Sequence, residues 1–277
     1  MVVSLFVLGI FLFAFVAYRQ SLKEGYDYVS RAAAPVRSKM FPVPPYHREL
    51  LQKYFRYYQG LSEQNKRAFE QRVCRFIYSK KFIPRGMKEI PLEMLVFVAA
   101  VAVQITFGLP NVRLTHFNKI LVYPDNYYSR ITQRYHKGEV NPAFGIIVLS
   151  WTNFMEGFLH AEDAINLGLH EMAHALRIEN IIRKEHSFFE GSLLDKLDEW
   201  CKRICDDSTG SIAFFRPYAC TNVHEFFSVA VENFFERPQQ FKLELPELYS
   251  VMVGLLNQDP IAINVNAHVG GVEEWKR

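Results

Sequence analysis

The chain has 277 residues, of which 49% are hydrophobic and 22% are charged, so it carries ample apolar material for a folded core and is neither disordered nor of low complexity. Its 32 Lys and Arg residues nearly balance 29 Asp and Glu residues, with the two signs well mixed, and we therefore expect no nucleic acid among its partners. No repeat of fixed period is present, which argues against solenoids and propellers.

The chain begins with an apolar run. Residues 1–17 carry no charge and only Ser4 as a polar side chain. A helix of this length reaches about 25 Å, close to the thickness of a bilayer core. Positive residues such as Arg19 and Lys23 follow the run and none precedes it. We therefore predict a transmembrane anchor over residues 1–18 in a single-pass membrane protein with a cytoplasmic body. A cleaved signal peptide with an exported domain is the alternative.

Four prolines (Pro35, Pro42, Pro44 and Pro45) discourage regular helix in the next segment, which we interpret as a juxtamembrane linker over residues 19–45. A globular domain is expected over residues 46–265 and a C-terminal tail over residues 266–277.

Apolar periodicity in the domain predicts helices over residues 62–80, 92–109, 163–180, 190–206, 223–236 and 247–257. Short runs rich in β-branched residues predict strands over residues 119–124 and 145–151. The fold class predicted from this pattern is α+β, helix-rich with a small sheet.

The segment LEMLVFVAAVAVQITFGL, residues 92–109, is apolar enough to resemble a second membrane span. However, Glu93 interrupts it, and Pro91 and Gly108 bracket it as a helix start and stop. We interpret it as a core helix buried on all sides.

The four cysteines lie at Cys74, Cys201, Cys205 and Cys220, and none of them forms a CxxC pair. They are too sparse for a disulfide framework, and we expect small, buried and reduced side chains in a reducing compartment.

The predicted helix over residues 163–180 contains the most informative motif, His170-Glu171-Met172-Ala173-His174, an HExxH. On a helix the two histidines lie one turn apart on the same face, so both imidazoles can reach one metal ion. Glu171 then lies beside that ion, where it can take a proton from water. Because the surrounding residues are apolar, unpaired histidines on this helix would be costly.

A zinc hydrolase of this kind needs a third protein ligand. Glu225 and Glu232 are seven residues apart on the later predicted helix and share nearly the same face. Two histidines from one helix and a glutamate from another form the gluzincin arrangement, and spacing alone leaves both glutamates as candidates.

The chain from about residue 115 to Pro260 resembles the MtfA (Mlc titration factor A) family of zinc peptidases. The matching segments are LVYP at 121–124, VLSW at 148–151, AINLGLHEMAH at 164–174, Tyr218, HEFFSVAVENFFERP at 224–238 and QDP at 258–260. The same order of HExxH, tyrosine and glutamate is the layout of the anthrax lethal factor catalytic domain, which the family resembles. The resemblance implies a zincin-like (gluzincin) domain.

The resemblance also implies roles for individual residues. His170, His174 and Glu225 would bind Zn²⁺, and Glu171 would act as the general base. Tyr218 would donate a hydrogen bond to the tetrahedral oxyanion. Glu232 then becomes a residue that orients a ligand histidine. The strand at 145–151 is expected to offer its edge to an extended peptide substrate.

The leading hypothesis is a membrane-anchored zinc metallopeptidase that hydrolyses peptide or protein substrates. The alternative is a regulatory protein that binds and titrates a transcription factor or signalling partner, as the family does with the glucose repressor Mlc. A third hypothesis is a structural membrane protein with an incidental HExxH motif.

Overall fold

The computed structural model describes residues 42–109, 112–129, 133–160, 162–207 and 214–264. The anchor predicted over residues 1–18 and the tail predicted over residues 266–277 lie outside these residues, as does nearly all of the linker predicted over residues 19–45. The domain boundaries therefore stay predictions. Within the described part of the chain, no helix is both long and apolar enough to cross a bilayer.

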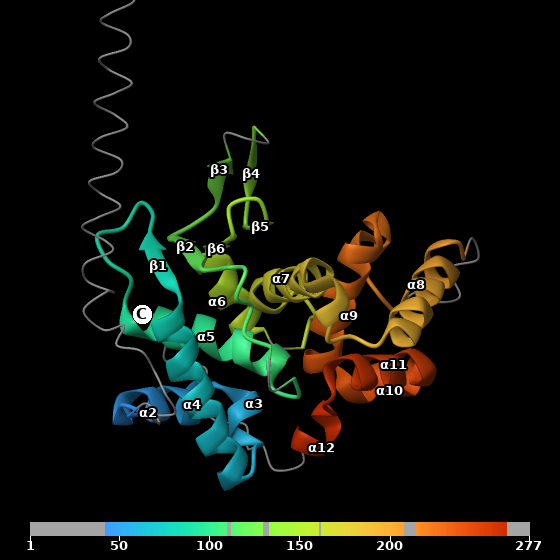
Figure 1. Cartoon of the computed structure of the whole chain (residues 1–277), viewed down its shortest axis with the longest axis horizontal. Helices are drawn as coiled ribbons and strands as arrows, with labels where there is room; N and C mark the ends of the chain where they lie inside the picture. The colour runs from blue at the N-terminus through green and yellow to red at the C-terminus, as the bar shows by residue number, and fades with distance from the viewer. Residues whose placement is uncertain (1–41, 110–111, 130–132, 161, 208–213, 265–277) are drawn as a thin grey trace, which may run out of the picture. The chain divides into compact units, whose positions relative to one another are not determined.

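The described residues form an α+β domain, as the sequence predicts (Figure 1). Its helices are α2 (Pro45–Tyr54), α3 (Arg56–Gln59), α4 (Glu63–Ser79), α5 (Leu92–Thr106), α6 (Trp151–Leu159), α7 (Leu167–Arg183), α8 (Gly191–Cys205), α9 (Val223–Glu236), α10 (Pro238–Glu244), α11 (Pro246–Leu256) and α12 (Pro260–Asn264). Its 3₁₀ helices are η1 (Lys184–His186) and η2 (Pro217–Thr221). Its strands are β1 (Lys81–Pro84), β2 (Lys119–Tyr123), β3 (Tyr127–Ser129), β4 (Arg134–His136), β5 (Gly138–Asn141) and β6 (Ile146–Ser150).

Four strands form one sheet in the order β1-β2-β6-β5. The first three are parallel, and β5 runs antiparallel to β6 with Gly138 opposite Leu149. Strands β3 and β4 form a separate antiparallel ribbon that stands away from this sheet (Figure 1). The strand predicted over 145–151 is thus an interior strand, and β5 ends the sheet on that side.

All six predicted helices and both predicted strands are confirmed. The side chain of Ser62 accepts a hydrogen bond from the Asn65 amide and caps α4, as its position before Glu63 favours. Helix α5 is buried along nearly its whole length, which explains why it is apolar on every side.

Helices α2, α3, α6, α10 and α12 and strands β1, β3, β4 and β5 were not predicted from the sequence. The four strands are only three or four residues long, so they carry too few alternations for a period to show. Helix α6 begins at Trp151, directly after β6, where Ser150 ends the strand and its side chain caps the helix.

Helix α7 lies between the sheet and α9 and packs against both (Figure 1). It begins at Leu167 rather than at the predicted residue 163, because the Asn166 side chain accepts a hydrogen bond from the Leu169 amide and caps the helix there. Just before this cap, Ala164 has a φ of 58° in the left-handed region, where a side chain is strained. The HExxH helix therefore starts from a strained turn.

The cysteine prediction was wrong for one pair, because Cys205 and Cys220 form a disulfide with a Cα–Cα distance of 5.3 Å. The other two cysteines are free, with Cys74 buried and Cys201 half-buried. The bond joins the end of α8 to η2. A separation of 15 residues in the sequence cannot show that the chain returns to the end of α8, so pairing was invisible in the spacing.

We expect two titratable thiols per chain, rather than four, when the protein is denatured without reductant. Replacing both Cys205 and Cys220 by alanine should destabilise the domain by roughly 3 kcal/mol, the value for closing a loop of this length. Thermal unfolding measures the loss. Cys201→Ala, one helical turn away and outside the bond, should change the melting temperature far less. Four thiols in the denatured wild type would contradict the disulfide.

Candidate metal centre

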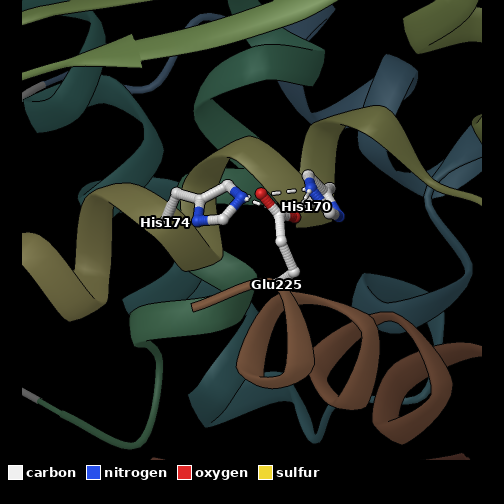
Figure 2. Close-up of side chains that lie close together, drawn as sticks. All are labelled: His170, His174 and Glu225. Carbon is white, nitrogen blue, oxygen red and sulfur yellow. Dashed lines mark hydrogen bonds and ion pairs between the residues drawn. The ribbon is translucent and has the colours of Figure 1, made fainter. Parts of the chain in front are cut away.

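The two histidines of the HExxH motif lie on the face of α7 that packs against the start of α9 (Figure 2). Asn222 caps α9 by accepting hydrogen bonds from the amides of His224 and Glu225, which fixes Glu225 in the first turn. Of the sequence-predicted residues, His170, His174 and Glu225 form a group whose ligand atoms all lie within 4.8 Å of one another.

Three of their atoms converge closely. His170 Nε2 lies 3.0 Å from Glu225 Oε2, His174 Nε2 lies 3.2 Å from the same oxygen, and the two Nε2 atoms are 3.1 Å apart. Three ligands about 2.0 Å from a tetrahedral zinc ion would lie about 3.3 Å from one another. The donor atoms are thus spaced as a metal ion of this kind requires, and two imidazoles with a carboxylate form a suitable donor set.

The second candidate glutamate has a different place. Glu232 is 1% exposed, and its Oε1 lies 2.7 Å from Nδ1 of His170, on the ring side away from Glu225. When Nδ1 carries the proton and donates a hydrogen bond to Glu232, the lone pair on Nε2 of His170 points toward His174 and Glu225. The geometry therefore separates the two glutamates that spacing left open.

The carboxylates around His170 also affect its charge. Burial disfavours the charged imidazole, but Glu225 and Glu232 outweigh burial and raise the pKa of His170 to about 9. Burial likewise opposes the ionised form of Glu225, yet hydrogen bonds from His170 and His174 hold the pKa of its carboxyl far below the ordinary value. These contacts therefore favour a protonated imidazole at His170 beside an ionised carboxylate at Glu225.

Glu171 is 6% exposed and lies against β5. Burial, with Glu225 and Glu139 as nearby negative charges, raises the pKa of Glu171 to about 7 despite the opposing effect of the two histidines. Its carboxyl group approaches Gly138 so closely that a Cβ at that position would stand 2.5 Å from Oε1. Only glycine fits there without moving the carboxyl.

Tyr218 lies on η2, beside the same group. It is 49% exposed, and its ring centroid is 5.9 Å from that of His170. Burial of part of the side chain and the negative charge of Glu225 raise the pKa of its hydroxyl to about 12, so it remains a proton donor at neutral pH.

A cleft of about 590 Å³ opens beside these residues. Its lining combines His170, Glu171 and Tyr218 with Tyr135 and His136 of β4 and the exposed Ile165. Four of the six predicted site residues line this space: His170, Glu171, Tyr218 and Glu232. The cleft is large enough to accept part of a peptide.

Four further residues lie at or beside the site and were not predicted from the sequence: Gly138, Asn166, Arg216 and Glu236. Asn166 had a readable signal, since asparagine directly before a periodic apolar run is a common helix cap. Gly138 and Arg216 had none, because each reaches the site through contacts between segments that are far apart in the sequence.

A match to known proteins adds to this geometry. The family model of the glucose-regulated metallo-peptidase M90 matches residues 30–255. The chain belongs to this family. It is 25% identical over 229 residues to Mlc titration factor A of Pectobacterium atrosepticum, which covers 73% of this chain and 82% of that protein. A similar match, 26% over 238 residues, is to "Uncharacterized protein slr2042" of Synechocystis sp. (strain ATCC 27184 / PCC 6803 / Kazusa) and covers 76% of this chain and 83% of the relative.

Membership of the M90 family confirms the resemblance to the MtfA family and makes this chain metallopeptidase-like, with a metal ion implied. The likeness to lethal factor stays a prediction.

Glu236, one turn after Glu232 on α9, has an unusual charge state for a carboxyl group. Its Oε1 accepts a hydrogen bond of 2.8 Å from Asn166 Nδ2. Burial, with Glu232 and Asp163 as neighbouring acids, raises the pKa of Glu236 to about 8. The folded protein thus holds a proton at neutral pH that the unfolded chain releases.

A carboxyl whose pKa is raised in the folded state loses its stabilising effect as the pH rises from the unfolded value of 4.5 through about 8. We therefore expect the melting temperature of metal-free Glu236→Gln, relative to wild type, to increase between pH 5 and pH 9. The gain at pH 9 should be about 2–6 °C, after allowing for partial exposure. Glu244→Gln, an exposed site on α10, serves as the control. A difference that does not depend on pH would refute this account of Glu236.

Proposed function

We propose that this chain is a zinc-dependent metallopeptidase of the HExxH type. The observation that supports it best is the convergence of His170 Nε2, His174 Nε2 and Glu225 Oε2 to within 3.2 Å of one another. Glu171 lies beside them, on the helix that carries the two histidines. His170, His174 and Glu225 bind Zn²⁺ in this proposal. Imidazole and carboxylate ligands suit zinc, which catalytic sites commonly bind through three protein ligands.

A bound zinc ion supplies Lewis acidity and lowers the pKa of water at the site. Glu171 takes the proton of the attacking water and passes it to the leaving amine. The carboxyl group of Glu171 can serve in both steps, because an ionised carboxylate accepts the proton and the neutral acid releases it. The Tyr218 hydroxyl donates a hydrogen bond to the oxyanion of the substrate, which its exposed position at the cleft allows.

The prediction that the strand over residues 145–151 offers its edge to substrate is wrong. The strand β6 lies between β2 and β5, so its backbone groups are paired on both sides and cannot take up a peptide. Strand β5 ends the sheet beside the site, and its Gly138 contacts the Glu171 carboxyl. We propose that an extended substrate adds to the outer side of β5, where its scissile bond meets Glu171.

A regulatory role is the second candidate, and the match to Mlc titration factor A favours it. In that role the surface binds a transcription factor or another protein, and the metal site has weak activity or none. The two functions are compatible in one molecule. They differ in their dependence on Glu171, because binding through the surface should survive Glu171→Gln.

We also propose that residues 1–18 anchor the chain in a membrane as a single span. The positive residues after the run favour a cytoplasmic domain. The Cys205–Cys220 disulfide points the other way, since such bonds persist mainly in oxidising compartments. Cells quenched in acid and then alkylated under denaturing conditions decide between the orientations, because Cys74 is buried in the folded domain. Four alkylated thiols support a cytoplasmic domain, and two support an exported one.

The full-length chain in detergent should bind about one zinc ion and hydrolyse a mixture of unstructured peptides. Glu171→Gln should retain zinc and lose at least about 100-fold in hydrolysis, because it removes the base alone. Glu225→Ala should lose both hydrolysis and zinc, because it removes a proposed zinc ligand. The control is His224→Ala, the neighbouring residue, which lies outside the group of converging ligand atoms.

Metal content and peptide-cleavage rates are measured on the same preparations. Zinc bound at one per chain with no cleavage of any peptide favours the regulatory role. A wild type that binds no zinc rules out the proposed site.

Gly138→Ala should retain zinc but reduce hydrolysis by about 10-fold or more, because the added Cβ displaces the Glu171 carboxyl. Gly191→Ala is the matched control, since a Cβ at that position meets no atom within 4 Å. Metal analysis and initial rates test both variants. Full activity in Gly138→Ala would show that the contact with Glu171 does not matter.

A further inference from the structure

Arg216 has no role in the proposed mechanism, yet its side chain makes three hydrogen bonds beside the candidate metal centre. Its guanidinium group donates two hydrogen bonds to Glu232, from Nη2 to Oε1 at 2.7 Å and from Nη1 to Oε2 at 3.0 Å. Nη1 also donates to the backbone carbonyl of Ala164. A single side chain thus joins α9 to the turn that precedes the HExxH helix.

The Glu232 carboxylate is saturated by these partners. Oε1 is shared by His170 Nδ1 and Arg216, and Oε2 by Arg216 and the backbone amide of Asn166 at 2.7 Å. A carboxylate has about four acceptor directions, and all are used. Because the group is 1% exposed, its negative charge needs such compensation, and Arg216 provides the fixed positive charge.

The second contact explains how the strained turn persists. Ala164 is 3% exposed with a φ of 58°, a conformation that a side chain adopts only when its surroundings enforce it. Arg216 binds its carbonyl oxygen, and two residues later Glu232 binds the amide of Asn166, the cap of α7. The same guanidinium therefore fixes the start of the helix that carries both histidines.

Arg216 is itself held from both sides. Phe214 and Phe215 precede it and are buried against Phe241, and Cys220 follows it at the end of η2 in the disulfide with Cys205. The planar fork of arginine suits three acceptors placed around it, whereas the single ammonium group of lysine does not.

We propose that Arg216 is a positioning residue of the metal centre, which holds Glu232 against His170 and holds the Ala164 turn at the start of the HExxH helix. The proposal rests on the zinc site proposed above and assigns to Arg216 no contact with zinc or substrate. It acts through Nδ1 of His170, which must be held if Nε2 is to face the ion.

The experiment measures zinc affinity by competition with a chelator, and the absorption spectrum of the cobalt-substituted protein, in the full-length chain. Neither measurement needs a substrate. Arg216→Ala should bind zinc about 10–100-fold more weakly and show a changed cobalt spectrum, as expected when a partner of a ligand histidine is lost. Arg216→Lys should lie between this variant and wild type.

The matched control is Arg183→Ala at the other end of α7. Arg183 binds the carboxylate of Glu179, which also accepts hydrogen bonds from backbone amides, just as Glu232 does. The two pairs are equally buried: the side chains of Arg183 and Glu179 are 26% and 2% exposed, and those of Arg216 and Glu232 are 27% and 1% exposed. Its loss should lower thermal stability but leave zinc affinity within about twofold and the cobalt spectrum unchanged.

A double variant tests the route of the effect. If Arg216 acts through Glu232, then Arg216→Lys should weaken zinc binding much less in a Glu232→Gln background than in wild type. Arg216→Lys also carries the test if Arg216→Ala does not fold. Three results would each overturn the proposal. The first is an unchanged zinc affinity and cobalt spectrum in a folded Arg216 variant, and the second is an equal loss of zinc affinity in Arg183→Ala. The third is a double variant in which the two losses of zinc affinity simply add.

Failure of the proposed function has a different signature. A wild type that binds zinc but cleaves nothing removes the peptidase function and leaves these binding results to decide the role of Arg216. A wild type that binds no zinc overturns both.

Discussion

The structure depends on the electrostatic balance where α7 meets α9. Two imidazole nitrogens and a carboxylate oxygen converge to within 3.2 Å in a largely buried setting, an arrangement that repels itself unless positive charge lies among the three atoms. The two other acids of α9 are stabilised in different ways. Arg216 and the Asn166 amide compensate the charge of Glu232, whereas burial raises the pKa of Glu236 so that it keeps its proton. The three carboxyl groups of α9 thus have three different sets of partners: the two histidines for Glu225, Arg216 and the Asn166 amide for Glu232, and the Asn166 side chain for Glu236.

Much of this could be predicted from the sequence, because the strongest signals are local. The HExxH motif lies on a helix whose period places both histidines on one face. Helix α5 is predicted by the length and uniform apolarity of its sequence. The separation of Glu225 from Glu232 required the family resemblance, since both lie on nearly the same face of α9.

Other parts of the site could not be predicted, because they arise from contacts between distant segments. Arg216 is 16 residues from Glu232 and approaches it only after η2 folds back along α9. Gly138 lies in a four-residue strand whose pattern is too short to read, and the disulfide joins elements that spacing does not connect. The predicted substrate edge was wrong for the same reason: strand order is a property of the whole sheet, and the 145–151 run shows only that a buried strand is present.

If substrates add to the outer side of β5, as proposed, the position of this strand restricts what the protein can cleave. A chain that pairs with a strand must itself be extended over several residues, and a folded domain offers such a stretch only at a terminus, a long loop or a locally unfolded segment. A compact partner that binds the outer surface would therefore keep its peptide bonds away from Glu171. In such a molecule, resistance to cleavage would be a property of the partner's own fold, and the same protein could capture one class of protein intact while digesting another.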